Sequence, residues 1–168
     1  LRERTRAILD GPPHSGDSKL SRLSEASGYS LSEGGKRVRP VLLYLSAESM
    51  GYDGIAQGLD HTAAALELIH TYSLIHDDLP AMDDDDMRRG KPSLHKAYDE
   101  ATAILVGDGL QARAFELLAD APGLSDSKKV RMIKVLAHAA GPAGMVGGPY
   151  IDIQATDSEM TLEELQTM

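Results

Sequence analysis

Cysteine and tryptophan are absent from the 168 residues, and there is a single phenylalanine. Without cysteine the chain has no disulfide, no thiolate zinc site and no cysteine nucleophile, which fits a reducing compartment such as the cytoplasm. Aromatic residues make up only 4% of the chain, and Leu and Ala outnumber Val and Ile. This composition favours helices over sheets, so we expect an all-α fold.

Long apolar runs and an excess of basic residues are also missing. The longest apolar run covers residues 41–45, far short of the ~20 residues that a membrane span needs. The chain does not open with the basic and apolar regions of a signal peptide. Its 17 Lys and Arg against 26 Asp and Glu give a net charge of −9, whereas nucleic-acid binders need a basic surface. We expect a cytoplasmic protein with no stable membrane insertion and no nucleic-acid partner.

Most of the negative charge lies in one short segment. Six of the ten residues from Asp77 to Asp86 are aspartates, and without those six the net charge would be −3. Clustered carboxylates repel one another and raise each other's pKa unless a cation is present. Hard oxygen ligands of this kind suit Mg²⁺ or Ca²⁺. The function of the protein therefore depends largely on what this acidic segment, residues 77–86, binds.

Periodicity and punctuation predict a series of helices and no clear strand. The expected helices cover residues 1–9, 20–29, 40–50, 59–78, 98–119, 125–140 and 161–168. Pro40 suits the first turn of its helix, Pro80 should end or kink the helix before it, and Pro149 disfavours a helix running through it. Gly107 and Gly109 each cost a helix ~1 kcal/mol relative to Ala, so we expect them to allow close packing.

The spacing of the acids favours a magnesium site over an EF-hand calcium site. Acids four residues apart share a helix face. Asp77 and Asp83 are two residues further apart than that, with a proline between them, so we expect a bulge that brings both carboxylates to one face of the helix. An EF-hand loop starting at Asp83 or Asp84 would need acids where Met87 and Arg88 stand. Mg²⁺ typically takes one or two carboxylates and uses substrate phosphates for the rest of its coordination.

Basic residues flank the acidic segment. Arg88 and Arg89 follow it directly, and Lys36, Arg37 and Arg39 lie upstream. Arginine forks match phosphate oxygens bidentately, so carboxylates that hold Mg²⁺ beside arginines would form a diphosphate clamp. Two blander interpretations stay open: an acidic module that binds cations without diphosphate, and a solvated charged surface.

Two stretches resemble the trans-isoprenyl diphosphate synthase, or polyprenyl synthetase, family. They are residues 65–110, ALELIHTYSLIHDDLPAMDDDDMRRGKPSLHKAYDEATAILVGDGL, and residues 34–40, GGKRVRP. The resemblance runs from about Leu20 to the last residue and points to the bacterial farnesyl diphosphate synthases in particular. It implies an all-α isoprenoid synthase-type bundle around a central cavity, usually as a homodimer. The second aspartate-rich motif of the family is not among these 168 residues. We therefore expect residues 1–168 to be the N-terminal part of a single domain, inactive or nearly so alone.

The resemblance also assigns roles to the acidic segment. By position, Asp77, Asp78 and Asp83 match the first aspartate-rich motif, which holds Mg²⁺ bridged to the allylic diphosphate. Arg88 matches a ligand of that diphosphate. For residues 84–86 two interpretations stay open, direct metal contact or a solvated acidic turn.

A second, basic set matches the binding site for isopentenyl diphosphate. Its members are Lys36, Arg39, His70 and Arg89. His70 lies two helical turns before Asp77 and so on the same face of the predicted helix. His76 has no role by resemblance, and we expect it to be structural.

Tyr72 bears on the length of the product. It precedes Asp77 by five residues, about 7.5 Å along a helix at ~1.5 Å per residue, so its ring would form a floor for the growing prenyl tail. In the family an aromatic residue here, with an insertion of the Leu79-Pro80 type, goes with a C15 product, and a small residue goes with C20. If Tyr72 is an ordinary core residue, product length stays open.

The function implied is that of a Mg²⁺-dependent prenyltransferase. It would condense dimethylallyl and geranyl diphosphate with isopentenyl diphosphate to give farnesyl diphosphate, through ionisation of the allylic C–O bond and without a side-chain nucleophile. The alternatives are a geranylgeranyl or longer-chain synthase, and a non-catalytic subunit of the same fold.

Overall fold

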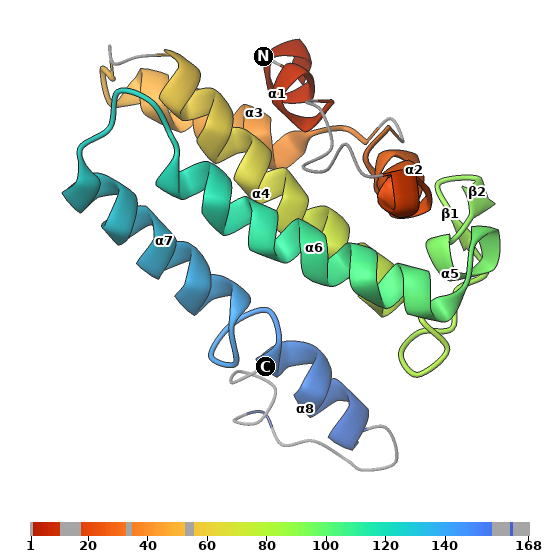
Figure 1. The fold of residues 1–168 in the computed structure, drawn as a ribbon. Coiled ribbons are helices and arrows are strands. Elements are labelled where there is room, and N and C mark those ends of the chain that lie inside the picture. The colour runs from red at the N-terminus through yellow and green to blue at the C-terminus, as the bar shows by residue number, and fades with distance from the viewer. Residues whose placement is uncertain (1, 11–17, 33–34, 53–55, 156–161, 163–168) are drawn as a thin grey trace. The chain divides into compact units, whose positions relative to one another are not determined.

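The structure is a computed structural model that describes residues 2–10, 18–32, 35–52, 56–155 and 162 (Figure 1). The chain divides into two compact units, Leu1–Leu124 and Ser125–Met168. Each unit is described by itself below. That the 168 residues belong to one domain stays a prediction.

The first unit is helical apart from one small hairpin, as the composition predicted. Its elements, in chain order, are α1 (Arg2–Leu9), the 3₁₀ helix η1 (Ser18–Leu20), α2 (Ser21–Ser32), α3 (Val38–Ser49), α4 (Ala56–Asp77), β1 (Met87–Arg88), β2 (Lys91–Pro92), α5 (Leu94–Ala97) and α6 (Glu100–Ala119). The hairpin and α5 lie between the helices expected over 59–78 and 98–119, where the sequence predicted neither a helix nor a strand.

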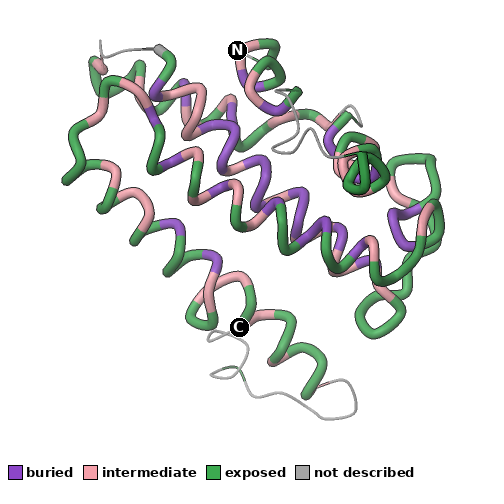
Figure 2. Tube along the Cα trace, in the orientation of Figure 1, coloured by how far each residue is buried: buried purple, intermediate pink, exposed green. Residues whose placement is uncertain are grey.

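Helices α4 and α6 lie side by side at the centre of this unit (Figure 1). Buried residues concentrate on these two helices (Figure 2). Around them, α1 and α3 pack against α4, while α2 contacts both α4 and α6. Three consecutive alanines of α4, residues 63–65, are fully buried. A helix that is enclosed on several sides belongs to the core, so α4 is a rigid central element that can position side chains at both of its ends.

Gly107 lets α6 pack closely against α4. A Cβ atom on Gly107 would overlap the imidazole of His76, whereas a Cβ on Gly109 would meet nothing within 4 Å. His76 Nε2 also donates to the carbonyl oxygen of Ile104, 3.1 Å away. The expectation of close packing is therefore confirmed for Gly107 and wrong for Gly109, and His76 links the two central helices.

The helix ends follow from their local chemistry. Pro40 lies in the first turn of α3, where a missing N–H costs little. Helix α4 ends at Asp77, three residues before Pro80. Helix α6 begins after Asp99, whose side chain accepts a hydrogen bond from the Thr102 N–H at 2.7 Å.

The second unit contains α7 (Asp126–Ala140) and α8 (Gly147–Ala155). Ser125 occupies the N-cap position of α7, but its side chain makes no capping hydrogen bond. The expectation that Pro149 disfavours a helix running through it is wrong: Pro149 is the third residue of α8, in the first turn, where a missing N–H costs little. The helix expected over 161–168 lies outside the described residues except for Leu162. Across the described part of the chain, no helix combines the length and apolar character needed to cross a membrane.

Candidate functional site

The acidic segment begins at the C-terminal end of α4 and folds back on it. The Asp83 N–H donates to the carbonyl oxygen of Asp77 at 2.9 Å, and the Asp84 N–H donates to that of Leu79 at 3.2 Å. The helix does not resume beyond this turn. The expected bulge inside a helix is therefore wrong: α4 ends, and a wide turn brings the backbone of Asp83 back to Asp77.

Asp77 carries unfavourable charge in this arrangement. It is half-buried, and burial raises the pKa of its carboxyl group; the neighbouring charges of Asp83 and Asp78 raise it further. The C-terminal end of a helix also carries partial negative charge, which disfavours an anion there. A bound cation would remove this repulsion, as expected of a metal ligand.

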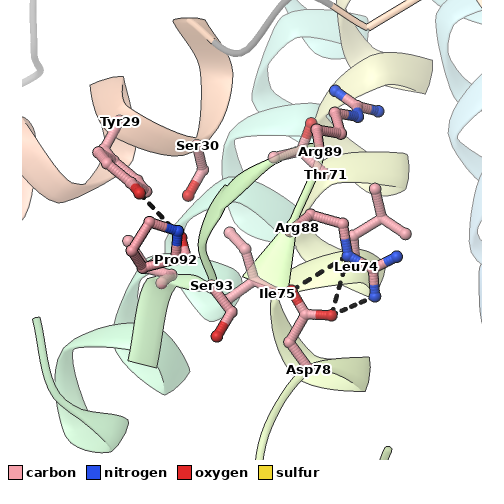
Figure 3. A pocket seen from close by; sticks show the side chains of 11 residues that line it. Tyr29, Ser30, Thr71, Leu74, Ile75, Asp78, Arg88, Arg89, Pro92 and Ser93 are labelled. Carbon is pink, nitrogen blue, oxygen red and sulfur yellow. Dashed lines mark hydrogen bonds and ion pairs between the residues drawn. The ribbon is translucent and has the colours of Figure 1, made fainter. Parts of the chain in front are cut away.

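Asp78 is buried and paired with Arg88. Arg88 Nε donates to both carboxylate oxygens of Asp78, at 2.9 and 3.2 Å, and Arg88 Nη2 makes a further contact with the same carboxylate. The close view shows this pairing, with Arg89 pointing away from Asp78 (Figure 3). Asp85 is a weaker second partner of Arg88, at 3.3 Å. The structure thus places two predicted site residues, Asp78 and Arg88, in contact with each other.

The hairpin of β1 and β2 explains why Arg88 and Arg89 diverge. Arg88 pairs with Lys91 across the two strands, and the turn residues Arg89 and Gly90 have φ angles of 52° and 83°. Positive φ at both positions defines a type I′ turn, which matches the twist of the strands. Strands of two residues leave no alternating pattern in the sequence, and Arg-Gly is not the usual Asn-Gly pair, so nothing local revealed the hairpin.

The predicted basic set comes together from three separate segments. A Cβ atom on Gly35 would lie 2.7 Å from Arg89 Nη1, so the segment that carries Lys36 and Arg39 lies close to Arg89. Burial lowers the pKa of His70, and the positive charges of Arg39 and Arg89 lower it further. The charges of both arginines therefore act on His70. Lys36 is exposed and follows Gly35 directly.

Arg37 anchors this basic segment, a role that the sequence did not reveal. Its guanidinium donates to Glu67 Oε1 and to the carbonyl oxygen of Leu31, both at 2.6 Å. Glu67 lies in the middle of α4 and is almost completely buried. A buried charge must be paired to be tolerated, so this ion pair fixes the start of α3 on α4. A partner 30 residues away could not be identified from spacing alone.

Backbone strain gathers in the same segments. Among the described residues, three other than glycine have positive φ: Arg37, Asp84 and Arg89. Left-handed backbone costs a non-glycine residue on the order of 1–3 kcal/mol and tends to cluster at functional sites. All three residues belong to the acidic segment or to the basic residues around it.

A small pocket lies between α2, the end of α4 and the hairpin (Figure 3). Its volume of about 30 Å³ suits one or two water molecules and is too small for a prenyl tail. The pocket is lined by residues of the predicted site and by residues of the neighbouring core, among them Tyr29, Thr71, Ile75, Asp78, Arg88 and Ser93. Tyr29 closes one side, because its hydroxyl donates to the carbonyl oxygen of Pro92 at 2.8 Å.

Tyr72 is buried on α4, one turn before His76. The two rings meet edge to face with centroids 5.4 Å apart, and burial raises the pKa of the Tyr72 hydroxyl. Its part in setting product length stays a prediction.

The predicted magnesium ligands fit the ion in part. Asp77 and Asp83 are brought together by the turn and supply the carboxylates that Mg²⁺ prefers, whereas Asp78 faces Arg88. Two carboxylates completed by substrate phosphates are enough for Mg²⁺. In the part of the chain that the structure describes, three potential ligand atoms lie within 4.8 Å of one another at a different place, formed by Asp84, Asp86 and His95.

Comparison with known proteins gives consistent matches. The chain is 51% identical over 144 residues to farnesyl diphosphate synthase from Haemophilus influenzae, covering 86% of this chain and 48% of that protein. It is 46% identical over 146 residues to the chloroplastic geranylgeranyl pyrophosphate synthase of Capsicum annuum, covering 86% and 39%. The crystal structure of an FPP/GFPP synthase from Zymomonas mobilis matches with a TM-score of 0.88 and 40% identity, over 99% of this chain and 60% of that one.

These matches confirm the predicted fold and family. The chain spans about half the length of the curated relatives it matches. The family model for polyprenyl synthetase matches residues 20–168, most of the chain. Together with the helical fold and the acidic and basic segments at one end of α4, this shows that the chain belongs to the polyprenyl synthetase family.

Proposed function

We propose that this chain binds the diphosphate groups and Mg²⁺ for a prenyltransferase that condenses allylic diphosphates with isopentenyl diphosphate to give farnesyl diphosphate. The observation that carries the proposal is that acidic and basic side chains gather along the C-terminal half of α4. Asp77 and Asp83 are joined by the turn, and the charges of Arg39 and Arg89 act on His70. A diphosphate with its metal ion needs both kinds of group.

On the allylic side, Asp77 and Asp83 would hold the metal, and Arg88 would bind the diphosphate. Bound Mg²⁺ would neutralise charge on the leaving diphosphate. Arg88 and Asp78 are each other's partners in the structure. We expect them to exchange partners when substrate arrives, Asp78 turning to the metal site and Arg88 to the phosphate oxygens.

On the isopentenyl side, Lys36, Arg39, His70 and Arg89 would bind the second diphosphate. Arg37 holds this segment in place through Glu67, which leaves its neighbours Lys36 and Arg39 exposed to ligand. Burial and the charges of Arg39 and Arg89 lower the pKa of His70 in the ligand-free chain, which favours the neutral imidazole there. Its ring N–H would donate a hydrogen bond to the diphosphate.

The reaction balances without a protein nucleophile. The allylic C–O bond breaks and its electrons leave with the diphosphate. The double bond of isopentenyl diphosphate then forms the new C–C bond, and a proton is lost to the released diphosphate. The chain's part is to place the two diphosphates and stabilise the departing charge.

Tyr72 supports farnesyl diphosphate as product over geranylgeranyl diphosphate. Overall identity does not separate the two, because both kinds of synthase are relatives of similar identity. A Tyr72→Ala substitution should lengthen the product from C15 to C20. Chromatography of the products would show this, using the chain joined to the C-terminal half of a relative. A homodimer in the cytoplasm is proposed on the family resemblance.

Binding calorimetry tests the proposal on the 168-residue chain itself. Mg²⁺ and geranyl diphosphate should each bind weakly alone and at least tenfold more tightly together. Asp77→Asn with Asp83→Asn should abolish this mutual strengthening, whereas Asp85→Asn, a neighbouring exposed aspartate, should preserve it. Independent binding of the two ligands would overturn the proposal. Because the second aspartate-rich motif of the family is not among these residues, we expect no measurable turnover from this chain alone.

A further inference from the structure

We propose that Asp84, Asp86 and His95 form a second divalent-cation site, separate from Asp77 and Asp83, that takes a borderline transition ion such as Zn²⁺. One ligand atom of each of the three residues lies within 4.8 Å of the others. Asp84 and Asp86 are exposed, but His95 is only 7% exposed. The site thus combines two solvent-facing carboxylates with one imidazole fixed in the protein interior.

His95 is the observation that points to a ligand. In the part of the chain that the structure describes, its Nε2 is the one buried side-chain nitrogen or oxygen atom without a hydrogen-bond partner. A buried polar atom left unpaired costs on the order of 1–3 kcal/mol and calls for an explanation. A cation bound at Nε2 would supply the missing partner.

The other ring nitrogen of His95 is placed as in a metal-binding histidine. Its Nδ1 lies 3.1 Å from Ser93 Oγ, which is itself buried. Metal-binding histidines usually donate their second ring N–H to an oxygen, and this fixes the tautomer and the ring orientation. With the proton on Nδ1, the lone pair of Nε2 is free to bind a cation.

One contact competes with the cation. Lys96 Nζ lies 2.8 Å from Asp86 Oδ1, and this ion pair lowers the pKa of the Asp86 carboxyl group. Both side chains are well exposed, and exposed ion pairs hold their partners weakly. A divalent cation would therefore displace Lys96 readily. The backbone of Asp86 is fixed independently, since its carbonyl oxygen accepts from the Ser93 N–H at 2.9 Å.

The donor set selects the kind of ion. Imidazole suits Zn²⁺ and other transition ions, whereas Mg²⁺ and Ca²⁺ prefer oxygen ligands alone. Two carboxylates and one histidine leave a fourth tetrahedral position for water. The bound ion would tie the acidic segment to α5 without occupying the magnesium ligands.

The test titrates Zn²⁺ into the 168-residue chain that carries Asp77→Asn and Asp83→Asn, so that the proposed magnesium ligands are removed. Calorimetry should give one Zn²⁺ per chain, and the ring-nitrogen NMR signals of His95 should shift with Zn²⁺ and not with Mg²⁺. Adding Asp84→Asn or Asp86→Asn should weaken Zn²⁺ binding at least tenfold. Adding Asp85→Asn, the aspartate between them, should leave it unchanged.

Two further variants address the supporting contacts. Ser93→Ala should weaken Zn²⁺ binding by about 10–100-fold, as expected for the loss of a histidine's orienting partner. Lys96→Gln should strengthen it severalfold, because the competitor is gone. Loss of Zn²⁺ binding in the Asp77 and Asp83 background, or equal effects of Asp85→Asn and Asp86→Asn, would overturn the site. Neither result bears on the coupling of Mg²⁺ and geranyl diphosphate, which is measured separately.

Discussion

The two ends of α4 carry the same kind of residue in opposite circumstances. Near its N-terminal end, Asp60 accepts a hydrogen bond from the Tyr44 hydroxyl at 2.6 Å and pairs with Arg4 at 2.7 Å. Thr5 Oγ1 lies 3.4 Å from the same hydroxyl. The positive end of the helix dipole also favours an anion there. We call these four residues the N-terminal network.

At the C-terminal end the charges oppose the helix. Asp77 and Asp78 lie where the helix dipole disfavours anions, and only Asp78 has a strong cationic partner, Arg88. Asp77 is instead half-buried, which raises the pKa of its carboxyl group, and the charges of Asp83 and Asp78 raise that pKa further. The N-terminal network therefore stabilises the fold, whereas the C-terminal end retains repulsion that a bound cation would relieve. Because of this difference we propose the second end as the site of function.

The largest effect should come from the one strong pair at the C-terminal end. Asp78→Ala should lower the free energy of unfolding by about 2–3 kcal/mol, because it leaves the partly buried charge of Arg88 without its partner. Urea denaturation followed by circular dichroism would measure this. Asp85→Asn, which removes the weaker and exposed partner of Arg88, should change it by less than about 0.5 kcal/mol. Equal effects would mean that burial of the pair does not matter.

The next effect concerns the contact that holds this end of α4 against α6. Gly107→Ala should destabilise the fold by about 1–3 kcal/mol, because the added methyl group displaces His76 from its bond to Ile104. Gly109→Ala is the matched control two residues away. Its methyl group meets open space, so it should stabilise the helix by up to about 1 kcal/mol. Thermal unfolding of both variants should move in opposite directions.

A smaller effect is expected from the N-terminal network. Tyr44→Phe removes the donor to Asp60 and should destabilise the fold by about 1–2 kcal/mol. Burial and the bond to Asp60 raise the pKa of Tyr44 to about 12. The stabilisation is thus complete below pH 10 and is lost as the pH rises through about 12. Stability curves of the two proteins that run parallel up to pH 10 and converge above it would confirm this.

The smallest effect has the opposite sign. Asp77→Asn should stabilise the metal-free chain at pH 7, by up to about 0.5 kcal/mol, since it removes a charge that the fold disfavours. Because the folded-state pKa of Asp77 is raised, its charge destabilises the fold above that pKa, and the penalty disappears as the pH falls through it. The stabilisation by Asp77→Asn should therefore become smaller at acidic pH and also when Mg²⁺ and diphosphate are added. A loss of stability at pH 7 in EDTA would contradict the comparison.

Much of this site was predictable because the signals are local. The six aspartates of the acidic segment and the arginines after it are adjacent in the chain, and the resemblance of residues 65–110 to a known family rests on continuous sequence. The main helices followed from composition, proline positions and apolar spacing. Pro80 and the capping residue Asp99 affect only the helix ends within a few residues of themselves, so such effects do not depend on a distant segment of the chain.

Contacts between distant segments were decided only by the tertiary structure. Arg37 meets Glu67, Gly107 meets His76, and Gly109 meets nothing, although the two glycines are alike in sequence. Side-chain pairing depends on how helices cross and where turns direct the chain, and local periodicity does not contain that information. The sequence by itself thus determined which charges the protein carries and where they gather. The fold decided which of them are neutralised by a partner, as Asp78 is by Arg88, and which lie in unfavourable surroundings, as Asp77 does.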